Sequence, residues 1–579
     1  MTKKILILIV LIVAYPYLAL AEFSFPADRV VTWEGNVGVD GGIPTDYAKH
    51  GSTIETADQG DDTSVIQAAL TAAGAAAGAG SGKFVLLGEG TFTTTSSLSV
   101  PSYVILRGAG MLLTIIDNTS GSTDSVVSVN NLTPTDCTTT TTSAIASGYT
   151  KGSTSLTLSD ASSFPVGRAI YVSDLNDSSI PVEPLGSDGK EWGGGCYQSG
   201  TERNRTQITE ITAKDGNVLT ISPPLYFALN AGLSPAAFLI RDLTQYAGVE
   251  NLTIENTGTL GVRVNLQFSG AANSWGKNVK LKTCGQSCVR FFFDVFKVEI
   301  RDSFFTECID RDSSDSCYGV HLYDGSSANL IENNLFYDTA NGIVAVATTG
   351  NVFGYNYFYK VYRTANYGQW FWNDNWTHGS HTSMNLWEGN DGNGIALDNL
   401  KGSSSHETIF RNRWHGWDST VTYSIYKNHT AIADCDLNNY INVIGNILGT
   451  SGFHDSYELK EASVSWFTIP VYSTDCYPQS GSPGAFDSML RHQNYDYYNT
   501  STKACGDSGE PGCQGGSTDT DLPDSLYLSG KPDFFGSVTW PPFDPVTPTI
   551  TDIPAKIFYE EGSWPSAVPA NAIQGVTIN

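Results

Sequence analysis

Five short apolar runs, each closing on an asparagine, recur between residues 327 and 450. The closing residues lie 22, 34, 22 and 34 positions apart and are Asn334, Asn356, Asn390, Asn412 and Asn446. A period near 22 with variable insertions is typical of a solenoid in which loops of different length leave one face of the rungs. The runs are short and rich in Val, Ile, Phe and Trp, which favours β-strands. Because asparagine tolerates a left-handed turn and its amide can bond to the same residue one rung above, we expect a β-solenoid with a stacked asparagine ladder.

The segment before this repeat has the pattern of an amphipathic helix. Asp61, Asp62 and Thr63 supply helix-capping side chains. The apolar residues that follow at helical spacing are Val65, Ile66, Ala69, Leu70 and Ala73. A short helix directly before a solenoid covers the open end of its core, as terminal caps must. The first strands are predicted at residues 83–87 and 103–106.

Three motifs in this N-terminal region carry a family resemblance. They are Gly60-Asp61-Asp62-Thr63 with Ile66-Gln67-Ala68-Ala69, then Gly88-Glu89-Gly90-Thr91-Phe92, then Val104-Ile105-Leu106-Arg107-Gly108-Ala109-Gly110. Together they resemble the start of the pectate-lyase-like right-handed parallel β-helix superfamily, over about residues 60–118. The resemblance implies an all-β, right-handed parallel β-helix. It does not imply one reaction, because the superfamily includes polysaccharide lyases, glycoside hydrolases, epimerases, phage tailspikes and non-enzymatic modules.

The composition divides the chain into five segments. Strand-like alternation from residue 150 to residue 224, after a run of threonines, indicates a small β-domain inserted between early rungs. The last hundred residues are rich in Pro, Gly, Ser and Asp, which favours a segment that wraps or caps the helix. The predicted segments are a signal peptide (1–21), the N-terminal segment with cap helix and first rungs (22–130), the inserted β-domain (131–245), the main β-helix with long loops (246–450) and the C-terminal wrapping segment (451–579).

The first residues predict export from the cytoplasm. Lys3 and Lys4 precede a short apolar core at residues 5–13, and Ala19-Leu20-Ala21 offers a cleavage site near Ala21. The apolar core is shorter than the roughly 20 residues that span a bilayer, and nothing later in the sequence suggests a membrane span. We therefore expect a secreted or periplasmic protein.

The charge and the cysteine content restrict which ligands and which cellular compartment we expect for this protein. The net charge of −27 opposes binding to nucleic acid, although a local basic cleft can still bind a polyanion. The ten cysteines favour disulfides in an exported chain, and no closely spaced zinc-binding pairs are present. The pairs Cys308–Cys317 and Cys505–Cys513 are the first choices, while the other connectivities stay open.

Aromatic and ionisable residues are most concentrated between Gln369 and Asp418. This stretch holds four of the nine histidines and six of the twelve tryptophans. Aromatic rings stack on the apolar faces of sugars, and polar groups then fix the orientation of the ligand. The predicted substrate-binding residues are Trp370, Trp372, Trp376, His378, His381, Trp387, Lys401, Arg413 and Trp414. The alternative is that the tryptophans pack beneath long loops and the histidines are hydrogen-bonded spacers.

Glu388 and Asp398 are the predicted acid–base pair. Glu388 stands two residues before a rung asparagine, where other rungs carry Phe410 or Ile444. A carboxylate at such a core-like position needs a partner or a raised pKa. Two carboxylates that flank a glycosidic bond can hydrolyse it, and Asp398 lies one short loop away. In the structural alternative, Glu388 forms an ion pair with Arg411 or Arg413 of the next rung.

β-Elimination beside a uronate is the second chemistry that these residues allow. There a base removes a proton and a cation neutralises the sugar carboxylate, roles for which His406 and Arg411, together with Lys401, are candidates. Hydrolysis is slightly favoured, because two carboxylates stand at the centre and no arginine–lysine cluster dominates.

Two weak patterns suggest metal sites. Asp310, Asp312 and Asp315 alternate along a loop, as calcium ligands do, but the glycine and distal glutamate of an EF-hand are missing. A disulfide between Cys308 and Cys317 explains that loop without calcium. His378 and His381, with His406 near them, could also hold a metal ion. Calcium is thus allowed, and no cofactor is required.

The sequence as a whole predicts a secreted carbohydrate-active protein that cleaves glycosidic bonds in a polysaccharide. The alternative is a non-catalytic polysaccharide-binding, adhesin or cell-envelope structural β-helix protein. No pattern indicates which sugar or linkage is recognised, or how many subunits assemble.

Overall fold

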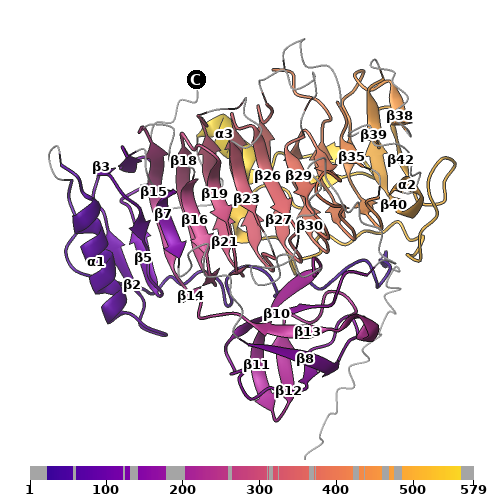
Figure 1. Ribbon diagram of the computed structural model, residues 1–579. Helices are drawn as coiled ribbons and strands as arrows, with labels where there is room; N and C mark the ends of the chain where they lie inside the picture. The colour runs from indigo at the N-terminus through magenta and orange to yellow at the C-terminus, as the bar shows by residue number, and fades with distance from the viewer. Residues whose placement is uncertain are drawn as a thin grey trace, which may run out of the picture.

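The chain folds into the right-handed parallel β-helix that the sequence predicts (Figure 1). The computed structural model describes residues 23–562 except for 57–59, 121–123, 131–140, 178–192, 194–202, 259–263, 310, 312–316, 324, 364–370, 372, 422–428, 436, 460–467 and 475–484. A typical rung has three strands, as in β24 (Leu330–Glu332), β25 (Leu335–Tyr337) and β26 (Asn341–Val346). The first two strands of each rung join one 22-stranded sheet, here sheet A, and the third joins an 11-stranded sheet, here sheet B.

Sheet A runs the length of the helix and carries two rows of strands. The first row is β1 (Ala48–Lys49), β2 (Lys83–Leu86), β5 (Val104–Arg107), β15 (Gly248–Asn256), β18 (Trp275–Lys282), β21 (Glu299–Arg301), β24, β27 (Val352–Gly354), β30 (Leu386–Glu388), β33 (Thr408–Phe410), β36 (Asn442–Ile444) and β40 (Leu490–His492). The second row is β3 (Gly90–Thr94), β6 (Thr114–Asn118), β22 (Phe304–Thr306), β25, β28 (Tyr357–Tyr359), β31 (Asp391–Gly392), β34 (Arg413–Trp414), β37 (Ile447–Leu448), β41 (Asn494–Asp496) and the antiparallel β42 (Ser501–Lys503). Strands β15 and β18 are long enough to belong to both rows.

Sheet B forms the third side of the rungs. Its strands are β4 (Leu98–Ser99), β7 (Ser125–Asn130), β16 (Val264–Ser269), β19 (Ser287–Phe291), β23 (Tyr318–Leu322), β26, β29 (Asn375–His378), β32 (Ile395–Leu397), β35 (Ile432–Asp434), β39 (Pro470–Ser473) and β38 (Ser456–Leu459). Neighbouring strands pair in parallel from rung to rung, so one position of each rung lies directly above the same position of the next.

The predicted asparagine ladder is confirmed at the corner between the two rows of sheet A. Each amide nitrogen donates to the amide oxygen of the next rung, from Asn334 to Asn356 at 3.0 Å and onward to Asn390, Asn412 and Asn446. The ladder extends one rung further than predicted, to Asn494 at 3.0 Å. A second ladder joins Asn329, Asn351 and Asn385 and ends on the Glu407 carboxyl, which accepts from Asn385 at 2.8 Å.

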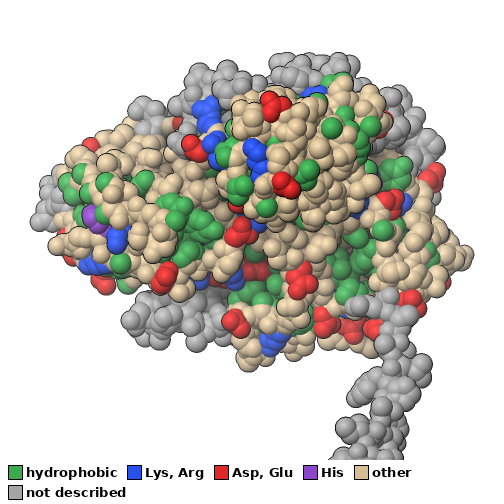
Figure 2. Space-filling model, turned by 90° about the horizontal axis from the view of Figure 1, so that it is seen from below, with side chains coloured by type: hydrophobic (Ala, Val, Ile, Leu, Met, Phe, Trp, Pro, Cys, Tyr) green, Lys and Arg blue, Asp and Glu red, His purple; other side chains and the backbone are tan. Residues whose placement is uncertain are grey.

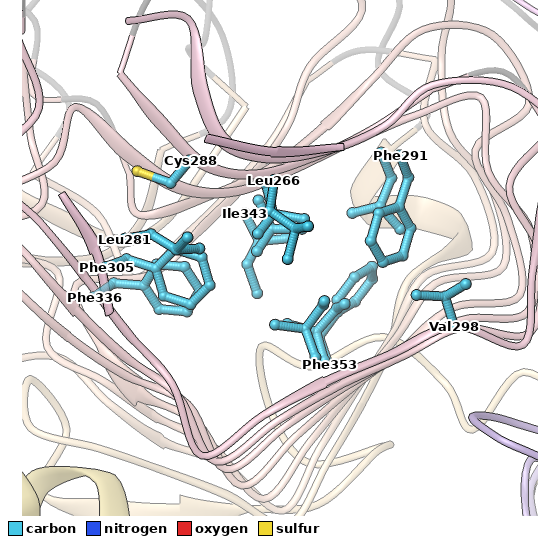
Figure 3. Packing of buried hydrophobic residues seen from close by; sticks show 14 of the residues in the cluster. Leu266, Leu281, Cys288, Phe291, Val298, Phe305, Phe336, Ile343 and Phe353 are labelled. Carbon is cyan, nitrogen blue, oxygen red and sulfur yellow. The ribbon is translucent and has the colours of Figure 1, made fainter. Parts of the chain in front are cut away.

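Stacked apolar side chains fill the interior of the helix. Leu281, Phe305 and Phe336 lie one above another (Figure 3), and the rings of Phe305 and Phe336 are stacked at 4.4 Å. Phe353 and Trp387 stack in the same way at 4.1 Å. Such repetition lets every rung bury its apolar face against its neighbours, which a single rung cannot do alone.

Helix α1 (Thr63–Ala76) covers the N-terminal end of this core, as predicted. Ile66, Leu70 and Ala73 are buried beneath it, whereas Val65, assigned to the same stripe from the sequence, is 53 % exposed. Asp61, one residue before the N-cap Asp62, accepts from the Thr63 backbone N–H at 3.0 Å.

The inserted β-domain is a closed antiparallel barrel that projects from one side of the helix (Figure 1). Its strands are β8 (Thr142–Ser147), β9 (Ser155–Leu158), β10 (Ala169–Ser173), β11 (Thr206–Asp215), β12 (Val218–Ser222) and β13 (Ala236–Leu239). Seen from the barrel side, acidic side chains are spread among apolar and neutral ones (Figure 2), in keeping with the net charge.

The C-terminal segment packs along the outer face of sheet A. Phe534, Phe535, Phe543 and Phe558 are buried in one apolar cluster with outward-facing residues of that sheet. Helix α3 (Pro554–Glu561) belongs to this covering layer. The shorter elements nearby are α2 (Ala485–Ser488), β43 (Phe543–Asp544) and β44 (Thr549–Ile550), and a small sheet of β14 (Thr244–Gln245), β17 (Ala271–Ala272) and β20 (Val295–Phe296) lies at another corner.

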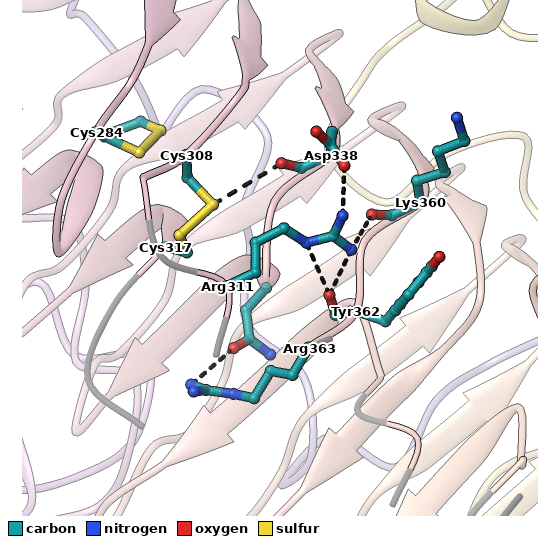
Figure 4. The surroundings of a disulfide bond; sticks show 10 residues. Cys284, Cys308, Arg311, Cys317, Asp338, Lys360, Tyr362 and Arg363 are labelled. Atoms are coloured by element: carbon teal, nitrogen blue, oxygen red, sulfur yellow. Dashed lines mark hydrogen bonds and ion pairs between the residues drawn. A yellow bond between two sulfur atoms is a disulfide. The ribbon is translucent and has the colours of Figure 1, made fainter. Parts of the chain in front are cut away.

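The disulfides Cys308–Cys317 and Cys505–Cys513 are both formed, as expected, and Cys284–Cys288 is a third. Beside the first of them, Arg311 donates to the Tyr362 and Lys360 carbonyls and pairs with Asp338 (Figure 4). This network ties the residue-311 loop to the two following rungs. Within the described part of the chain, no helix has the length and apolar character that crossing a membrane requires.

Candidate functional site

Several long connections between rungs lead into strands of sheet B. Residues 307–317, 360–374 and 415–431 lead into strands β23, β29 and β35, whereas only residues 338–340 lead into β26. Long loops that leave one face of a rigid scaffold are where binding and catalytic residues concentrate. The outer face of sheet B is therefore the first place to look for a site.

Strand alternation decides which side chains occupy this outer face. Val289, Val320, Ile343 and Ile395 point into the core. The next residue along each strand points outward, and these residues form a row in register across the rungs. The row is Gln267, Arg290, His321, Val344, Trp376, Ala396 and Ala433. A second outward row contains Val346 and His378 in register, with Asp398 on the next rung. We call Arg290, His321, Trp376, His378 and Asp398, together with Tyr318 and Tyr323, the sheet B cluster.

His378 and Asp398 form an imidazole–carboxylate pair in this cluster. The Nδ1 atom of His378 lies 2.6 Å from Oδ2 of Asp398, and the other carboxylate oxygen accepts from the Leu400 backbone N–H at 3.2 Å. The Asp398 side chain is 1 % exposed and that of His378 18 % exposed. With the proton of the imidazole on Nδ1, where Asp398 accepts it, Nε2 is the atom that can take up a proton.

His321 is the second histidine of the cluster. It is 4 % exposed, with its ring 3.9 Å from that of Tyr323 and 4.5 Å from that of Tyr318. Its Nδ1 atom has no hydrogen-bond partner among the described residues. Burial, reinforced by the nearby charges of His378 and Arg290, holds the pKa of His321 well below its usual range. A neutral histidine with an unused ring nitrogen can bind a ligand group, because burying that atom unpaired is costly.

Arg290 places a fixed positive charge next to His321. Its guanidinium donates to Gln267 at 2.9 Å and Gln286 at 3.2 Å, and it forms an ion pair with Asp124. The guanidinium also lies over the ring of Phe292, 4.6 Å from its centre. These contacts hold Arg290 rigidly on the outer face, although the chain as a whole is acidic.

Glu388 occupies a different environment from Asp398. It points outward from sheet A beneath the C-terminal segment, accepting from the Tyr355 hydroxyl at 3.0 Å and the Leu526 backbone N–H at 2.9 Å. Asp398 follows a strand of sheet B and shares no hydrogen-bond partner with Glu388. The structure therefore does not join these two carboxylates in one acid–base pair. The alternative ion pair is absent as well, because Arg411 donates to carbonyls of the C-terminal segment instead.

Burial raises the pKa of Glu388 to about 7, from an ordinary value of 4.5. The folded protein then keeps a proton on Glu388 that the unfolded chain loses, so its stabilisation is full below pH 4.5 and is lost as the pH rises through about 7. The Glu388→Gln side chain is neutral at every pH. As the pH rises from 4.5 to above 7, we therefore expect the free energy of unfolding of this variant to fall less than that of the parent. Urea unfolding at several pH values measures the difference.

The control for this prediction is Glu34→Gln, which removes an exposed carboxyl group that is solvated in both states. Its free energy of unfolding is expected to run parallel to that of the parent at every pH. A Glu388→Gln profile that also runs parallel to the parent would contradict the role assigned to burial.

Two predicted histidines lie on the barrel side of the helix. Burial, with Arg205 nearby, lowers the pKa of His381 to about 3, and burial with Lys151 and Arg29 nearby lowers that of His406 to about 3. The His406 ring packs against Tyr440 at 4.9 Å. Neither residue belongs to the sheet B cluster, and both remain neutral at physiological pH.

The predicted tryptophans that lie within the described residues divide between the interior of the β-helix and the outer side of sheet B, and all are buried. Trp387 and Trp414 are fully buried inside the β-helix, which corrects their assignment as surface ligands for a sugar. Arg413 is also buried, and it donates to the Trp414 and Ile447 carbonyls. Trp376 lies on the outer face of sheet B, where its indole N–H donates to the Asn373 carbonyl at 2.9 Å. Lys401 is half-buried in the loop after Asp398.

The remaining predicted residues, Trp370, Trp372, Asp310, Asp312 and Asp315, lie outside the described residues. In the part of the chain that is described, no three His, Cys, Asp or Glu side chains are grouped as a metal ion requires.

Sequence reasoning missed Arg290, His321, Tyr318 and Tyr323. Their signal is the alternation of polar residues with Val289, Phe291, Val320 and Leu322 along two strands that pair in register. Each strand alone carries one polar residue at this position, and only alignment of the rungs brings them together.

Comparison with known proteins gives no family. No family model matches the chain, and no curated protein matches its sequence. Similar solved structures include a surface adhesin of Streptococcus pneumoniae (TM-score 0.34, 12 % identity, covering 78 % of this chain and 88 % of the other). An alginate lyase from Paenibacillus is similar with a TM-score of 0.33 and 11 % identity, covering 77 % of this chain and 95 % of the other. A tailspike of Pseudomonas phage phi297 is similar with a TM-score of 0.32 and 10 % identity, covering 75 % of this chain and 77 % of the other. Because these TM-scores are low, the fold rests on the strand pairing described above, and no activity is drawn from these neighbours.

Proposed function

We propose that the protein cleaves a polysaccharide bound along the outer face of sheet B, with His378 as the general base and Asp398 as the group that orients it. The observation that carries this proposal is the 2.6 Å contact between His378 Nδ1 and Asp398, on the same face as the unpartnered Nδ1 of His321 two strands away. A base held in one tautomer by a buried carboxylate is the usual arrangement for proton transfer.

The reaction that these groups favour is β-elimination next to a sugar carboxylate. Nε2 of His378 takes the proton from the carbon beside the carboxylate, and the electron pair of that C–H bond is first held as a carbanion delocalised onto the carboxylate. This pair forms the carbon–carbon double bond as the glycosidic C–O bond on the next carbon breaks, and the leaving oxygen takes a proton from solvent or a tyrosine such as Tyr323. Arg290 lies on the same face three strands away, which is roughly 14 Å by strand spacing, so its proposed role is to bind a carboxylate on another sugar unit of the polymer.

Elimination is preferred here to the hydrolysis that the sequence slightly favoured. Hydrolysis by two carboxylates needs both of them at the same glycosidic bond. Glu388 is buried under the C-terminal segment while Asp398 lies at the edge of sheet B, so the reason for favouring hydrolysis does not apply to this pair. The imidazole–carboxylate pair remains as the stronger acid–base unit.

Non-catalytic binding of a polysaccharide is a second candidate function. The observation in its favour is that this face offers little exposed chemistry, since Val344, Val346, Ala396, Ala433 and Trp376 are all 8 % exposed or less. A ligand can be held at the edge of such a face by a few polar groups without being cleaved. Both candidates place the ligand on one surface, and they differ in whether the chain of the ligand is shortened.

The proposed location is outside the cytoplasm. Three disulfides are formed between described cysteines, and Cys435 is also disulfide-bonded. Disulfides form and persist in oxidising compartments, where extracellular polysaccharides are met.

The test incubates the purified exported chain with a panel of uronate-containing and neutral polysaccharides. Cleavage by elimination yields unsaturated products that absorb in the ultraviolet, together with new reducing ends, whereas hydrolysis yields reducing ends alone. Unsaturated products from a uronate polymer support the proposal. Reducing ends without absorbance would overturn the elimination step, and binding with no shortening of any polymer would favour the second candidate.

A further inference from the structure

A cavity of about 870 Å³ lies on the outer face of sheet A, on a different side of the rungs from the sheet B cluster. Its floor carries one charged residue from each of five rungs in register, Arg107, Glu250, Lys277, Arg301 and Glu332. Further along, the same row carries Gly354 and Glu388 and then becomes apolar at Phe410 and Ile444, where the C-terminal segment packs against it.

The walls of the cavity come from the two ends of the chain. The N-terminal segment contributes Val37, Ile43 and Pro44, and the C-terminal segment contributes Tyr527 and Phe534. The volume falls in the range of about 300–1,000 Å³ that is typical of small-molecule sites. Both segments could have packed directly on sheet A, as the C-terminal segment does beyond this point, but here they stand apart and leave space.

Most of the charges on the floor are already paired. Arg301 binds Glu299 at 2.9 Å, Glu332 at 3.0 Å and Asp302 at 3.2 Å, and Arg107 binds Glu250 at 2.8 Å. These pairs fix the carboxylates in place while leaving oxygen lone pairs that can accept hydrogen bonds. The floor is therefore rigid and presents acceptors to the cavity.

Two groups on the floor are not satisfied. Lys277 is half-buried and makes no ion pair or hydrogen bond with a described residue. Asn278 is 5 % exposed, and its Oδ1 atom has no partner among the described residues, although its amide nitrogen donates to Asn251 at 2.9 Å. Both line the cavity, so it contains an unused donor and an unused buried acceptor.

The chemistry of the lining selects a class of ligand. Five carboxyl groups against three cationic side chains disfavour an anion. Arg301 and Lys277 in the floor disfavour a free cation. Sugar hydroxyl groups both donate and accept hydrogen bonds, and the faces of sugar rings pack on aromatic rings such as Phe534 and Tyr527.

We propose that this cavity binds a neutral saccharide of one or two sugar units, with Lys277 and Asn278 as hydrogen-bonding partners. The site is separate from the sheet B cluster and does not depend on the function proposed for it. The two oxygens of Glu332 are already engaged, one by Arg301 at 3.0 Å and the other by the Tyr527 hydroxyl at 2.7 Å, so this residue fixes the floor and the wall together. The groups left to bind the ligand are Lys277 and Asn278.

Isothermal titration calorimetry of the full exported chain tests the proposal. The probes are the neutral disaccharides maltose, cellobiose, lactose and mannobiose, with digalacturonate and the glucosamine dimer as charged counterparts. At least one neutral disaccharide is expected to bind, with no binding of the charged dimers. Lys277→Met keeps the length of the side chain but removes the donor, and is expected to weaken binding by about tenfold.

Lys531→Met is the matched control. Lys531 is exposed in the C-terminal segment next to the cavity wall but does not line the cavity, so the same change there is expected to leave binding intact. Both variants should keep the parent melting temperature, since neither lysine is in an ion pair.

Three results would overturn this inference. The first is no binding of any of the four neutral disaccharides at about 10 mM, a concentration at which sites with a Kd of ~1 mM or somewhat weaker are still detected. The second is equal weakening of binding in both lysine variants. The third is binding of a charged dimer alone. Failure here is distinguishable from failure of the proposed cleavage, because His378→Ala should leave saccharide binding in this cavity unchanged. Lys277→Met, in turn, should leave cleavage unchanged.

Discussion

Replacement of His378 by alanine is expected to lower the cleavage rate by about 10²–10⁴-fold, the scale of a positioned general base. The loss of His378 also takes one hydrogen-bond partner from the buried Asp398 carboxyl group, so the melting temperature is expected to fall and rates are compared well below it. Asp398→Asn should also slow cleavage, because a neutral amide stabilises the charged imidazole less than a carboxylate does. Initial rates on the polymer that gives unsaturated products, with melting curves of each variant, measure both effects.

A double replacement separates a catalytic pair from two unrelated contributions. If Asp398 acts only by orienting His378, the double variant His378→Ala with Asp398→Asn should be no slower than His378→Ala alone. His50→Ala is the control, since His50 lies near the N-terminal end of the helix, away from sheet B. Full activity in His378→Ala would remove this residue from the mechanism. Multiplied effects in the double variant would mean that Asp398 has a separate role.

The asparagine ladder could be read from the sequence because its information is local. Each asparagine closes a short apolar run, and the turn it occupies needs only its own backbone and the same residue of the next rung. Spacing alone therefore placed Asn334, Asn356 and Asn390 correctly. The sixth member, Asn494, was missed because 48 residues separate it from Asn446.

The environment of Glu388 was harder to predict, because sheet A is covered on both faces. Trp387 and Ile409 point into the core, while Phe410 and Ile444 point outward under the C-terminal segment. A strand that is buried on both faces has a continuous apolar sequence. Its sequence therefore does not show which side chains point into the core and which point outward. The partner of Glu388, Leu526, lies 138 residues away in the sequence. Trp387 was placed on the surface for the same reason.

Sequence reasoning identified some members of the sheet B cluster and missed others. Trp376, His378 and Asp398 stood out because they lie in the stretch that is densest in aromatic and ionisable residues. Arg290 and His321 lie on earlier rungs, and only the register of β19 and β23 brings them onto the same face. Register between rungs depends on the lengths of the connecting loops, which composition does not reveal.

Replacement of Asn390 by alanine is expected to lower the free energy of unfolding by about 3–5 kcal/mol, taking about 1–3 kcal/mol for each buried group left without a partner. Asn390 is 1 % exposed. Its Oδ1 atom accepts from the backbone N–H of Asn356 at 3.0 Å and from the Asn356 amide at 3.1 Å. Its Nδ2 atom donates to the Phe353 carbonyl at 2.8 Å and to Asn412 at 2.9 Å. Alanine removes all four hydrogen bonds, and the backbone N–H of Asn356 loses its acceptor. Urea unfolding measures the change.

Asn36→Ala is the matched control, since the Asn36 side chain is only partly buried and donates to the nearby Thr32 and Glu34 carbonyls. Its cost is expected to be below about 1 kcal/mol, because water replaces those hydrogen bonds. Asn390→Asp keeps the acceptor but sets an oxygen against the Phe353 carbonyl and the Asn412 oxygen. It should cost at least as much as alanine at neutral pH, and less in acid, where a protonated carboxyl group can donate one hydrogen bond. If Asn390→Ala costs no more than Asn36→Ala, the ladder only exchanges hydrogen bonds with water, and apolar stacking alone holds the rungs in register.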